Sequence, residues 1–228
     1  MIRDGLMHIN SRLFLSLVIA FIALTVIVAT KAIDEFDDNI VRNAVSSTGN
    51  PATDMIMIIF STIADIFPFY FSPIIIISIM MLIKRKSRKA GAILLISLVV
   101  GVVIVAQLKQ FIDRERPDYE FKPNVGFEFI YEQDVLGRSK GSYPSGHATW
   151  STIFAYITAY LLRNYKIKGV KIAYILWILP IMVGISRVYI GAHYPTDVIG
   201  GILLGIIISN ILAVVLKIDK PITTNIGK

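Results

Sequence analysis

Two polar sequences, PSGH at 144–147 and SRVYIGAHYPTD at 186–197, bound the most informative stretch of this chain. Between them lie an apolar segment that ends at residue 162, a basic hairpin at 163–171 and a second apolar segment at 172–185. Successive membrane-spanning helices run in opposite directions, so this order predicts that both polar sequences lie at the same membrane face. They contain two of the three histidines of the chain.

The composition of the whole chain indicates a membrane protein. Of its 228 residues, 55% are hydrophobic, and the mean hydropathy is +0.67, whereas a soluble domain has about 45–50% apolar residues. The lack of cysteine excludes disulfides, zinc–thiolate sites and a cysteine nucleophile. A net charge of +7 could suit nucleic acid or anionic lipid, but the distribution of the charges favours a topology signal, and we expect no nucleic-acid partner.

Six apolar segments predict six transmembrane helices and an all-α integral membrane protein. Residues 51–65 are apolar too, but they are too short to cross, so we expect them to lie at the interface or to begin the next span. Gly201 and Gly205 permit close helix packing. We predict a single domain over 1–228 with a motif-bearing core at 90–216. The predicted spans are residues 13–30, 67–83, 90–106, 144–162, 172–185 and 198–216.

Basic residues predict the orientation of these spans. With both termini in the cytoplasm, the four inner segments carry 2, 5, 4 and 3 basic residues, which is 14 of the 23 in the chain. Only two of the 16 acidic residues lie there. Cytoplasmic loops of membrane proteins are rich in lysine and arginine. We therefore expect both termini inside and the polar motifs at the outer face of the cytoplasmic membrane.

The sequence PSGH predicts the start of a helix. Proline suits the first turn, and the amides of Ser145, Gly146 and His147 would then lack partners within the helix and could bind an anion. Gly146 has no side chain to prevent close approach, Ser145 adds a hydroxyl, and His147 is placed to protonate a leaving oxygen. The alternative is an ordinary helix cap with an incidental histidine.

Upstream of this sequence, Lys109 and Arg116 are two helical turns apart and share a face if the helix continues that far. Arg116 precedes Pro117, which disfavours helical geometry, so we expect the helix to end near Glu115. Taken alone, Lys109 could extend to the lipid head groups, and Arg116 could be a surface loop residue.

The second polar sequence ends the fifth span with Ser186 and Arg187 and continues through a tight turn that contains His193. Asp197 follows four residues later. A carboxylate at that reach can hold one imidazole nitrogen by its proton and leave the other as a lone pair. Imidazole prepared in this way is a nucleophile toward phosphorus. Separately, His193 could be a loop histidine and Asp197 a helix cap.

Together the three clusters fit the chemistry of phosphoryl transfer. They place one lysine, two arginines, one serine, two histidines and one aspartate at one membrane face. A phosphoryl transition state requires neutralised equatorial oxygens and in-line attack and departure. Two histidines and one aspartate beside three cations make a poor site for a divalent metal, so we expect neither a metal nor a cofactor.

The patterns Lys109-x6-Arg116-Pro117, PSGH at 144–147 and Ser186-Arg187-x5-His193-x3-Asp197 resemble the three signature motifs of the type 2 phosphatidic acid phosphatase (PAP2) family in order and spacing. The six-span layout resembles the membrane members of that family. This resemblance implies a PAP2/acid phosphatase-like helical bundle and a metal-independent phosphatase that works through a phosphohistidine. The family also contains soluble acid phosphatases and vanadium-dependent haloperoxidases, against which the six apolar segments argue.

The resemblance also implies roles for individual residues. His193 would attack phosphorus, Asp197 would orient His193, and His147 would protonate the leaving group. The phosphate oxygens would be held by Lys109, Arg116, Ser145, Gly146 and Arg187.

The substrate class that the resemblance favours is a lipid phosphate or diphosphate, with a polyprenyl diphosphate of the undecaprenyl type first. Phosphatidylglycerophosphate and phosphatidate are alternatives, and so is transfer of the phosphoryl group to another alcohol. A more remote alternative is a lipid carrier or scramblase without enzymatic activity, because fold does not fix function. Substrate and membrane lipids are the expected partners, and nothing in the sequence indicates an oligomeric state.

Overall fold

A computed structural model describes residues 11–64, 73–85, 87–119, 141–167 and 169–216. Apart from one short hairpin, the regular structure in these residues is entirely helical, as predicted. The hairpin is antiparallel, pairs Lys166 with Lys171, and forms the predicted basic turn. The elements are α1 (Ser11–Ala29), α2 (Asp34–Ser46), α3 (Pro51–Ile63), α4 (Pro73–Ile83), α5 (Arg88–Ile112), α6 (Gly146–Leu161), β1 (Lys166–Ile167), β2 (Val170–Lys171), α7 (Ile172–Leu176), α8 (Ile178–Tyr189) and α9 (Pro195–Val215).

Within the described residues, four helical stretches are long and apolar enough to cross a membrane. These are α1, α5, α9 and the consecutive helices α7 and α8. The other two predicted spans correspond to α6 and α4, which have 16 and 11 residues, fewer than the roughly 20 that cross a bilayer core. The segment predicted at 51–65 forms a separate helix, α3. Part of the span predicted at 67–83 lies outside the described residues.

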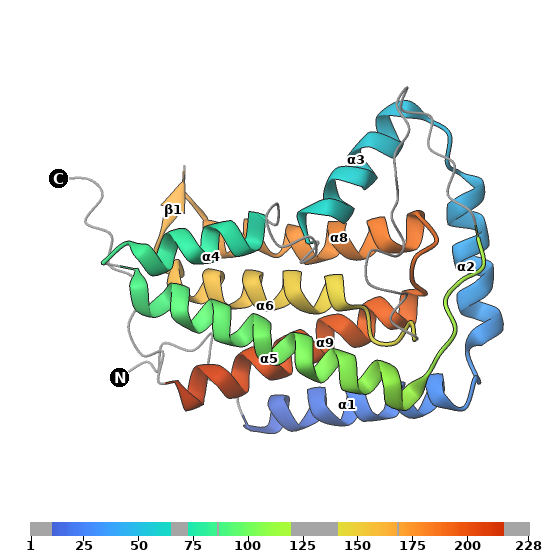
Figure 1. Ribbon diagram of the computed structural model, residues 1–228, viewed down its shortest axis with the longest axis horizontal. Coiled ribbons are helices and arrows are strands. Elements are labelled where there is room, and N and C mark those ends of the chain that lie inside the picture. Colours follow the sequence, from blue (N-terminus) through green and yellow to red (C-terminus); the bar gives the residue numbers. More distant parts are fainter. Residues whose placement is uncertain (1–10, 65–72, 86, 120–140, 168, 217–228) are drawn as a thin grey trace.

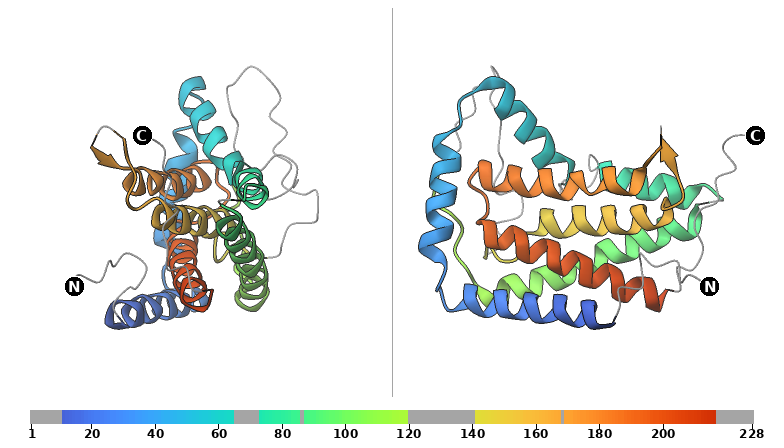
Figure 2. Two further views of the ribbon diagram at one scale, coloured as in Figure 1. Left: turned by 90° about the vertical axis from the view of Figure 1, so that its left-hand side faces the viewer. Right: turned by 180° about the vertical axis from the view of Figure 1, so that it is seen from behind.

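Helix α6 lies at the centre of the bundle. Figure 2 shows it surrounded by α5, α8 and α9. Fourteen of its 16 residues are buried, and Ile153 and Ile157 belong to one apolar cluster with Leu94 of α5 and Val183 of α8. Because its neighbours cover it on every side, α6 can carry serine, threonine and tyrosine and does not need the uniformly apolar surface of a lipid-facing helix.

Helix α1 has the opposite character and lies along the edge of the bundle (Figure 1). Val28 is its one buried residue, whereas Leu15, Ile19 and Ile22 each expose more than half of their surface. A helix with so little of its apolar surface covered by protein is stable where lipid covers the rest. Phe21 and Thr25 nevertheless hold α1 to the core, because the ring of Phe21 stacks on that of Tyr143 and the Thr25 hydroxyl lies 2.9 Å from its phenolic oxygen.

Close contact between α9 and α6 depends on two glycines. A Cβ atom at Gly201 would lie 2.5 Å from the carbonyl oxygen of Ser145, and one at Gly205 would lie 2.7 Å from Cβ of Thr152. Both distances are shorter than van der Waals contact, so the helices approach this closely only because these positions lack side chains. The packing role predicted for Gly201 and Gly205 is confirmed.

Helices α2 and α3 close one end of the bundle. Figure 1 shows α2 running across the ends of α8 and α9, while α3 returns toward α8. Asn50 caps α3 by accepting hydrogen bonds from the amides of Ala52 and Thr53, and Pro51 occupies the first turn. The end that α2 closes is the end at which the sequence motifs meet.

We expect the substitution Gly205→Val to destabilise the protein, because the added side chain would overlap Thr152 and force α6 and α9 apart. Overpacking of this kind costs about 1–3 kcal/mol, so the apparent melting temperature in detergent should fall by about 2–12 °C. The matched control is Val214→Ile, which adds a methyl group on the same helix at a position that is 53% exposed. Equal melting temperatures for the two variants would contradict the packing role of Gly205.

Candidate active site

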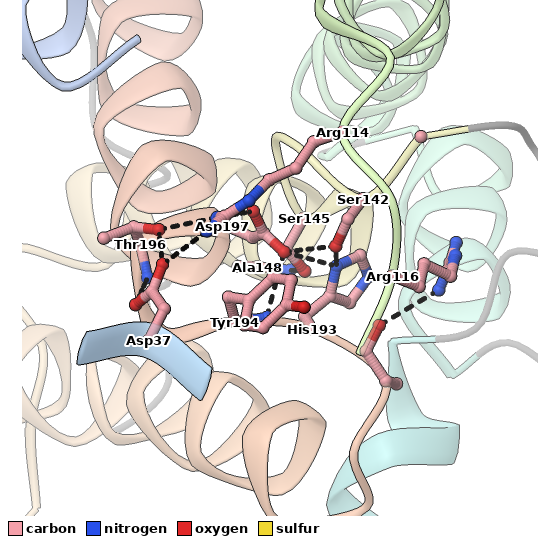
Figure 3. Close-up of polar contacts among 12 residues, drawn as sticks. Asp37, Arg114, Arg116, Ser142, Ser145, Ala148, His193, Tyr194, Thr196 and Asp197 are labelled. Carbon is pink, nitrogen blue, oxygen red and sulfur yellow. Dashed lines mark hydrogen bonds and ion pairs between the residues drawn. The ribbon is translucent and has the colours of Figure 1, made fainter. Parts of the chain in front are cut away.

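The residues of the three sequence motifs meet at the end of the bundle that α2 closes. Figure 3 shows Arg116, Ser145, His193 and Asp197 there. Each stands at an end of a helix or in the turn between two helices. The C-terminal ends of α5 and α8 lie beside the N-terminal ends of α6 and α9, so the antiparallel packing of these helices brings the residues together. They are Lys109 in the last turn of α5, Arg116 just beyond α5, Ser145, Gly146 and His147 at the start of α6, Arg187 in the last turn of α8, His193 in the turn between α8 and α9, and Asp197 in the first turn of α9.

The imidazole of His193 is fixed by its own turn and by Asp197. The backbone amides of Ala192 and His193 both donate to the carbonyl oxygen of Arg187, at 3.0 and 3.2 Å. His193 is 1% exposed, and its Nδ1 lies 3.4 Å from Oδ2 of Asp197 and 3.3 Å from the hydroxyl oxygen of Ser142. Because Nδ1 faces these oxygens, the tautomer with the proton on Nδ1 leaves Nε2 as a lone pair.

Asp197 is completely buried, and both of its carboxylate oxygens accept hydrogen bonds. Oδ2 accepts from the amide of Tyr194 at 2.9 Å and from the hydroxyl of Ser142, and Oδ1 accepts from Arg114 at 2.8 Å. The bond from Tyr194 is the cap of α9. The sequence left two alternatives for Asp197, a helix cap or a partner of His193. In the structure the same carboxylate caps α9 and faces His193.

Lys109 is buried and does not extend to the lipid head groups, which was one alternative from the sequence. It is 7% exposed, and its ammonium donates to the carbonyl oxygen of Gly141 at 3.2 Å. Gly141 has φ +106°, and a Cβ atom there would lie 2.5 Å from the carbonyl oxygen of Lys109. Glycine therefore permits both the backbone conformation and the close approach that hold this lysine.

The two arginines of the motifs are held by oxygens from other segments. Arg187 is 5% exposed and donates to the hydroxyl of Ser61 on α3 at 2.6 Å. Arg116 is half-buried and donates to the carbonyl oxygen of Ala192, the residue before His193, at 3.2 Å. Both of these hydrogen bonds end on neutral oxygens and orient the guanidinium groups.

Helix boundaries near the site differ from those predicted. Helix α5 ends at Ile112 and not near Glu115, because Asp113 adopts a left-handed conformation with φ 47° that closes the helix. Helix α6 begins at Gly146 with Ser145 as its cap, so Pro144 lies before the first turn and follows a cis peptide bond.

The start of α6 also differs from the predicted anion site in detail. The amide of Ser145 donates to the carbonyl oxygen of Asp197 at 2.9 Å and does not face an open site. The Ser145 hydroxyl accepts from the amide of Ala148, which leaves its own hydrogen as a donor. A Cβ atom at Gly146 would lie 2.8 Å from the ring of Trp150, whose centroid is 5.6 Å from that of half-buried His147. Gly146 therefore makes room for Trp150.

The surroundings of His193 favour its neutral form. Burial, followed by the positive charges of Arg116, Lys109 and Arg187, lowers the pKa of His193 well below its ordinary value of 6.5. A site with this excess of positive charge attracts an anion and keeps an imidazole available as a base or nucleophile. Among the described residues, no group of three or more histidine, cysteine, aspartate or glutamate side chains is placed to hold a metal ion.

Two residues that contact Asp197, Arg114 and Ser142, were not identified from the sequence. Ser142 lies two residues before PSGH, and Arg114 lies two residues before Arg116, in a charged stretch where nothing distinguishes it from its neighbours. Their only signal is proximity to the motifs. The third member of this network, Asp37 on α2, was one of several acids in a polar segment, and no local pattern connects it to the site.

Comparison with known proteins finds curated relatives over part of the chain. The chain is 35% identical over 127 residues to the phosphatidylglycerophosphatase B of Bacillus subtilis. The aligned region covers 53% of this chain and 56% of that protein. It is 34% identical over 152 residues to the undecaprenyl-diphosphatase of Sulfolobus acidocaldarius, which covers 64% of each. The chain thus spans about half to two thirds of the length of these curated relatives.

A solved structure covers more of the chain. The crystal structure of the first transmembrane PAP2 type phosphatidylglycerolphosphate phosphatase from Bacillus subtilis matches with a TM-score of 0.69 and 27% sequence identity, over 91% of this chain and 97% of that one. The model of the PAP2 superfamily matches residues 90–219. Because this match covers more than half of the chain and includes all three motifs, the chain belongs to the PAP2 superfamily.

Proposed function

We propose that this protein is a metal-independent lipid phosphatase that hydrolyses a lipid phosphate or diphosphate through a phosphohistidine. The observation that carries the proposal is the buried His193, whose Nδ1 lies 3.4 Å from the Asp197 carboxylate and whose surroundings include the charges of Lys109, Arg116 and Arg187. A nucleophile oriented by a carboxylate within a cluster of cations is what transfer of a phosphoryl group requires.

In the proposed reaction, Nε2 of His193 forms a bond to phosphorus while the bond from phosphorus to the leaving oxygen breaks. His147 gives its proton to that oxygen. Asp197 holds the Nδ1 proton and stabilises the positive charge that develops on the ring of His193. Water then attacks the phosphohistidine, His147 takes up a proton from it, and inorganic phosphate leaves with His193 restored.

The remaining motif residues neutralise the phosphate oxygens. Lys109, Arg116 and Arg187 supply positive charge, and Ser145 supplies a hydroxyl hydrogen. We assign Gly146 a contribution through the backbone start of α6, where amides without helical partners favour an anion. The chain needs no metal for these steps, because the cations balance the charge that a metal would otherwise balance.

For the substrate we favour a polyprenyl diphosphate of the undecaprenyl type. The named activity of the Sulfolobus acidocaldarius relative supports this choice, whereas that of the Bacillus subtilis relative supports phosphatidylglycerophosphate as the second candidate. Phosphatidate is a further candidate. Two alternatives to hydrolysis are transfer of the phosphoryl group to another alcohol and lipid transport without reaction. Neither alternative releases inorganic phosphate, so a phosphate assay distinguishes them from hydrolysis.

We also propose six spans, both termini in the cytoplasm and the site at the outer face of the cytoplasmic membrane. Helices α3 and α4 together would form the second span and α6 the fourth. Support comes from the arrangement in Figure 1, where the basic hairpin and the motif-bearing helix ends lie at opposite ends of the bundle. The single-domain interpretation of residues 1–228 belongs to the same proposal.

The substitution His193→Ala should abolish phosphate release, because it removes the nucleophile. We expect purified wild-type protein in detergent and EDTA to release phosphate from polyprenyl diphosphate faster than from phosphatidylglycerophosphate or phosphatidate. The rate with His193→Ala should be lower by about 1,000-fold or more. The matched control is His8→Ala, which changes the histidine that lies outside the motifs. Activity of His193→Ala equal to wild type, or loss of wild-type activity in EDTA, would contradict the mechanism.

The pH dependence of kcat/KM should show an acid limb below pH 6.5. Activity requires neutral His193. Burial and the neighbouring cations lower the pKa of His193, so the imidazole stays neutral until the pH falls below 6.5, the ordinary pKa of histidine. Activity should also fall at alkaline pH, because the proposed proton donor must carry its proton. The variant Arg116→Gln removes one of the cations and should move the acid limb to higher pH. A profile that is flat, or an acid limb above pH 6.5, would rule out this division of roles.

The orientation can be tested with single cysteines, because the chain has none of its own. Exposed Ser47 follows α2 at the proposed outer end, and exposed Lys84 lies in the basic turn proposed to be cytoplasmic. A membrane-impermeant maleimide applied to intact cells should label Ser47→Cys but not Lys84→Cys, and both should react after the membrane is opened. The reverse pattern would place the site in the cytoplasm.

A further inference from the structure

The guanidinium of Arg114 connects Asp197 to helix α2 (Figure 3). Its Nη1 lies 2.8 Å from Oδ1 of Asp197 and 2.8 Å from the hydroxyl of Thr196. Its Nη2 lies 2.8 Å from Asp34 and 2.8 Å from Asp37, both on α2. The two terminal nitrogens of this side chain are therefore both engaged by the protein, which leaves them unsuited to bind substrate phosphate.

Arg114 is one of three donors that fix which way the Asp197 carboxylate faces, and it is the one that holds Oδ1. Oδ1 takes the bond from Arg114, while Oδ2 takes the bonds from Ser142 and Tyr194 and faces Nδ1 of His193. A carboxylate can rotate about its bond to Cβ, so a fixed partner on one oxygen also fixes the other. The planar fork of arginine is suited to this role, because it presents several donors in one rigid geometry.

Asp37 anchors Arg114 from the other side. It is wholly buried and accepts hydrogen bonds from the amide of Thr196 at 3.3 Å, from the Thr196 hydroxyl and from Arg114. Burial works against the charge on Arg114, but the carboxylates of Asp197 and Asp37 raise the pKa of Arg114 above its ordinary value. The ring of Tyr194 lies 4.1 Å from the guanidinium carbon and covers it.

We propose that Arg114, anchored by Asp37, is a positioning residue that holds Asp197 in the orientation that directs His193 at phosphorus. The inference rests on the proposed function. It makes α2, which lies outside the segment that matches the family model, part of the apparatus that orients the nucleophile. Neither Arg114 nor Asp37 touches the substrate, so their effect is on the rate of the chemical step and not on phosphate binding.

The test measures kcat, KM and the inhibition constant of inorganic phosphate separately. For Arg114→Gln we expect kcat to fall by about 10- to 100-fold, by analogy with the loss of residues that orient metal-binding side chains through hydrogen bonds. KM and the inhibition constant should stay within about threefold, because the phosphate-binding cations remain. Arg114→Lys keeps the charge but not the fork and should restore part of kcat. Asp37→Asn should lower kcat in the same way.

A double variant tests whether Asp37 acts through Arg114. If it does, Arg114→Gln with Asp37→Asn should be no slower than Arg114→Gln alone, so the two effects should not multiply. The matched control is Arg42→Gln, which breaks an exposed ion pair between Arg42 and Asp38 on the same helix α2 and should leave kcat unchanged. The melting temperature of every variant in detergent is measured as well, to show that the variant is folded.

The outcomes separate this inference from the proposed function. If wild-type protein releases no phosphate, or His193→Ala is as active as wild type, the proposed function fails. If those results are as expected but Arg114→Gln keeps wild-type kcat, or raises KM and the inhibition constant instead, only the positioning role is overturned. If Arg114→Gln does not fold, Arg114→Lys and Asp37→Asn decide, and wild-type kcat in both would overturn the role.

Discussion

Complete hydrogen bonding of the buried Asp197 carboxylate is the constraint on which the arrangement of the site depends. A charge removed from water is stable only where donors and opposite charge replace the water. The donors to Asp197 are Ser142 before α6, Tyr194 before α9 and Arg114 after α5. Because these donors come from three segments, satisfying one carboxylate holds three helix ends together and fixes the place of His193 among them.

Charge is distributed around this carboxylate in two different ways. Arg114 forms ion pairs with Asp197, Asp34 and Asp37, so its charge is balanced within the protein and joins α2 to α9. Lys109, Arg116 and Arg187 donate to the oxygens of Gly141, Ala192 and Ser61, which are neutral. Their charge acts on His193, whose pKa is lowered by burial and by these neighbours. The site therefore combines a neutral imidazole with positive charge, which suits the proposed nucleophile and the proposed anionic substrate.

Much of the fold and part of the site could be predicted from the sequence because they depend on local chemistry. Long apolar segments indicated the helices, and Gly201 and Gly205 indicated close packing of α9. The pair His193 and Asp197 could be recognised because four residues separate them across the start of one helix. The helix end at Ile112 was not predicted, since the left-handed backbone of Asp113 sets it, and neither was the start of α6 at Gly146. Burial of α6, the central helix, was not predicted either.

The order of residues along the chain was enough to indicate the membrane class from composition and the family from the resemblance of three short motifs, and it predicted groups that could handle a phosphate. The partners that orient those groups required the folded molecule. Arg114 meets Asp37 across 77 residues, and Arg187 meets Ser61 across 126. Contacts at such separations arise when packed helices bring α2 and α3 over the ends of α8 and α9, and no short-range pattern of side chains encodes that approach.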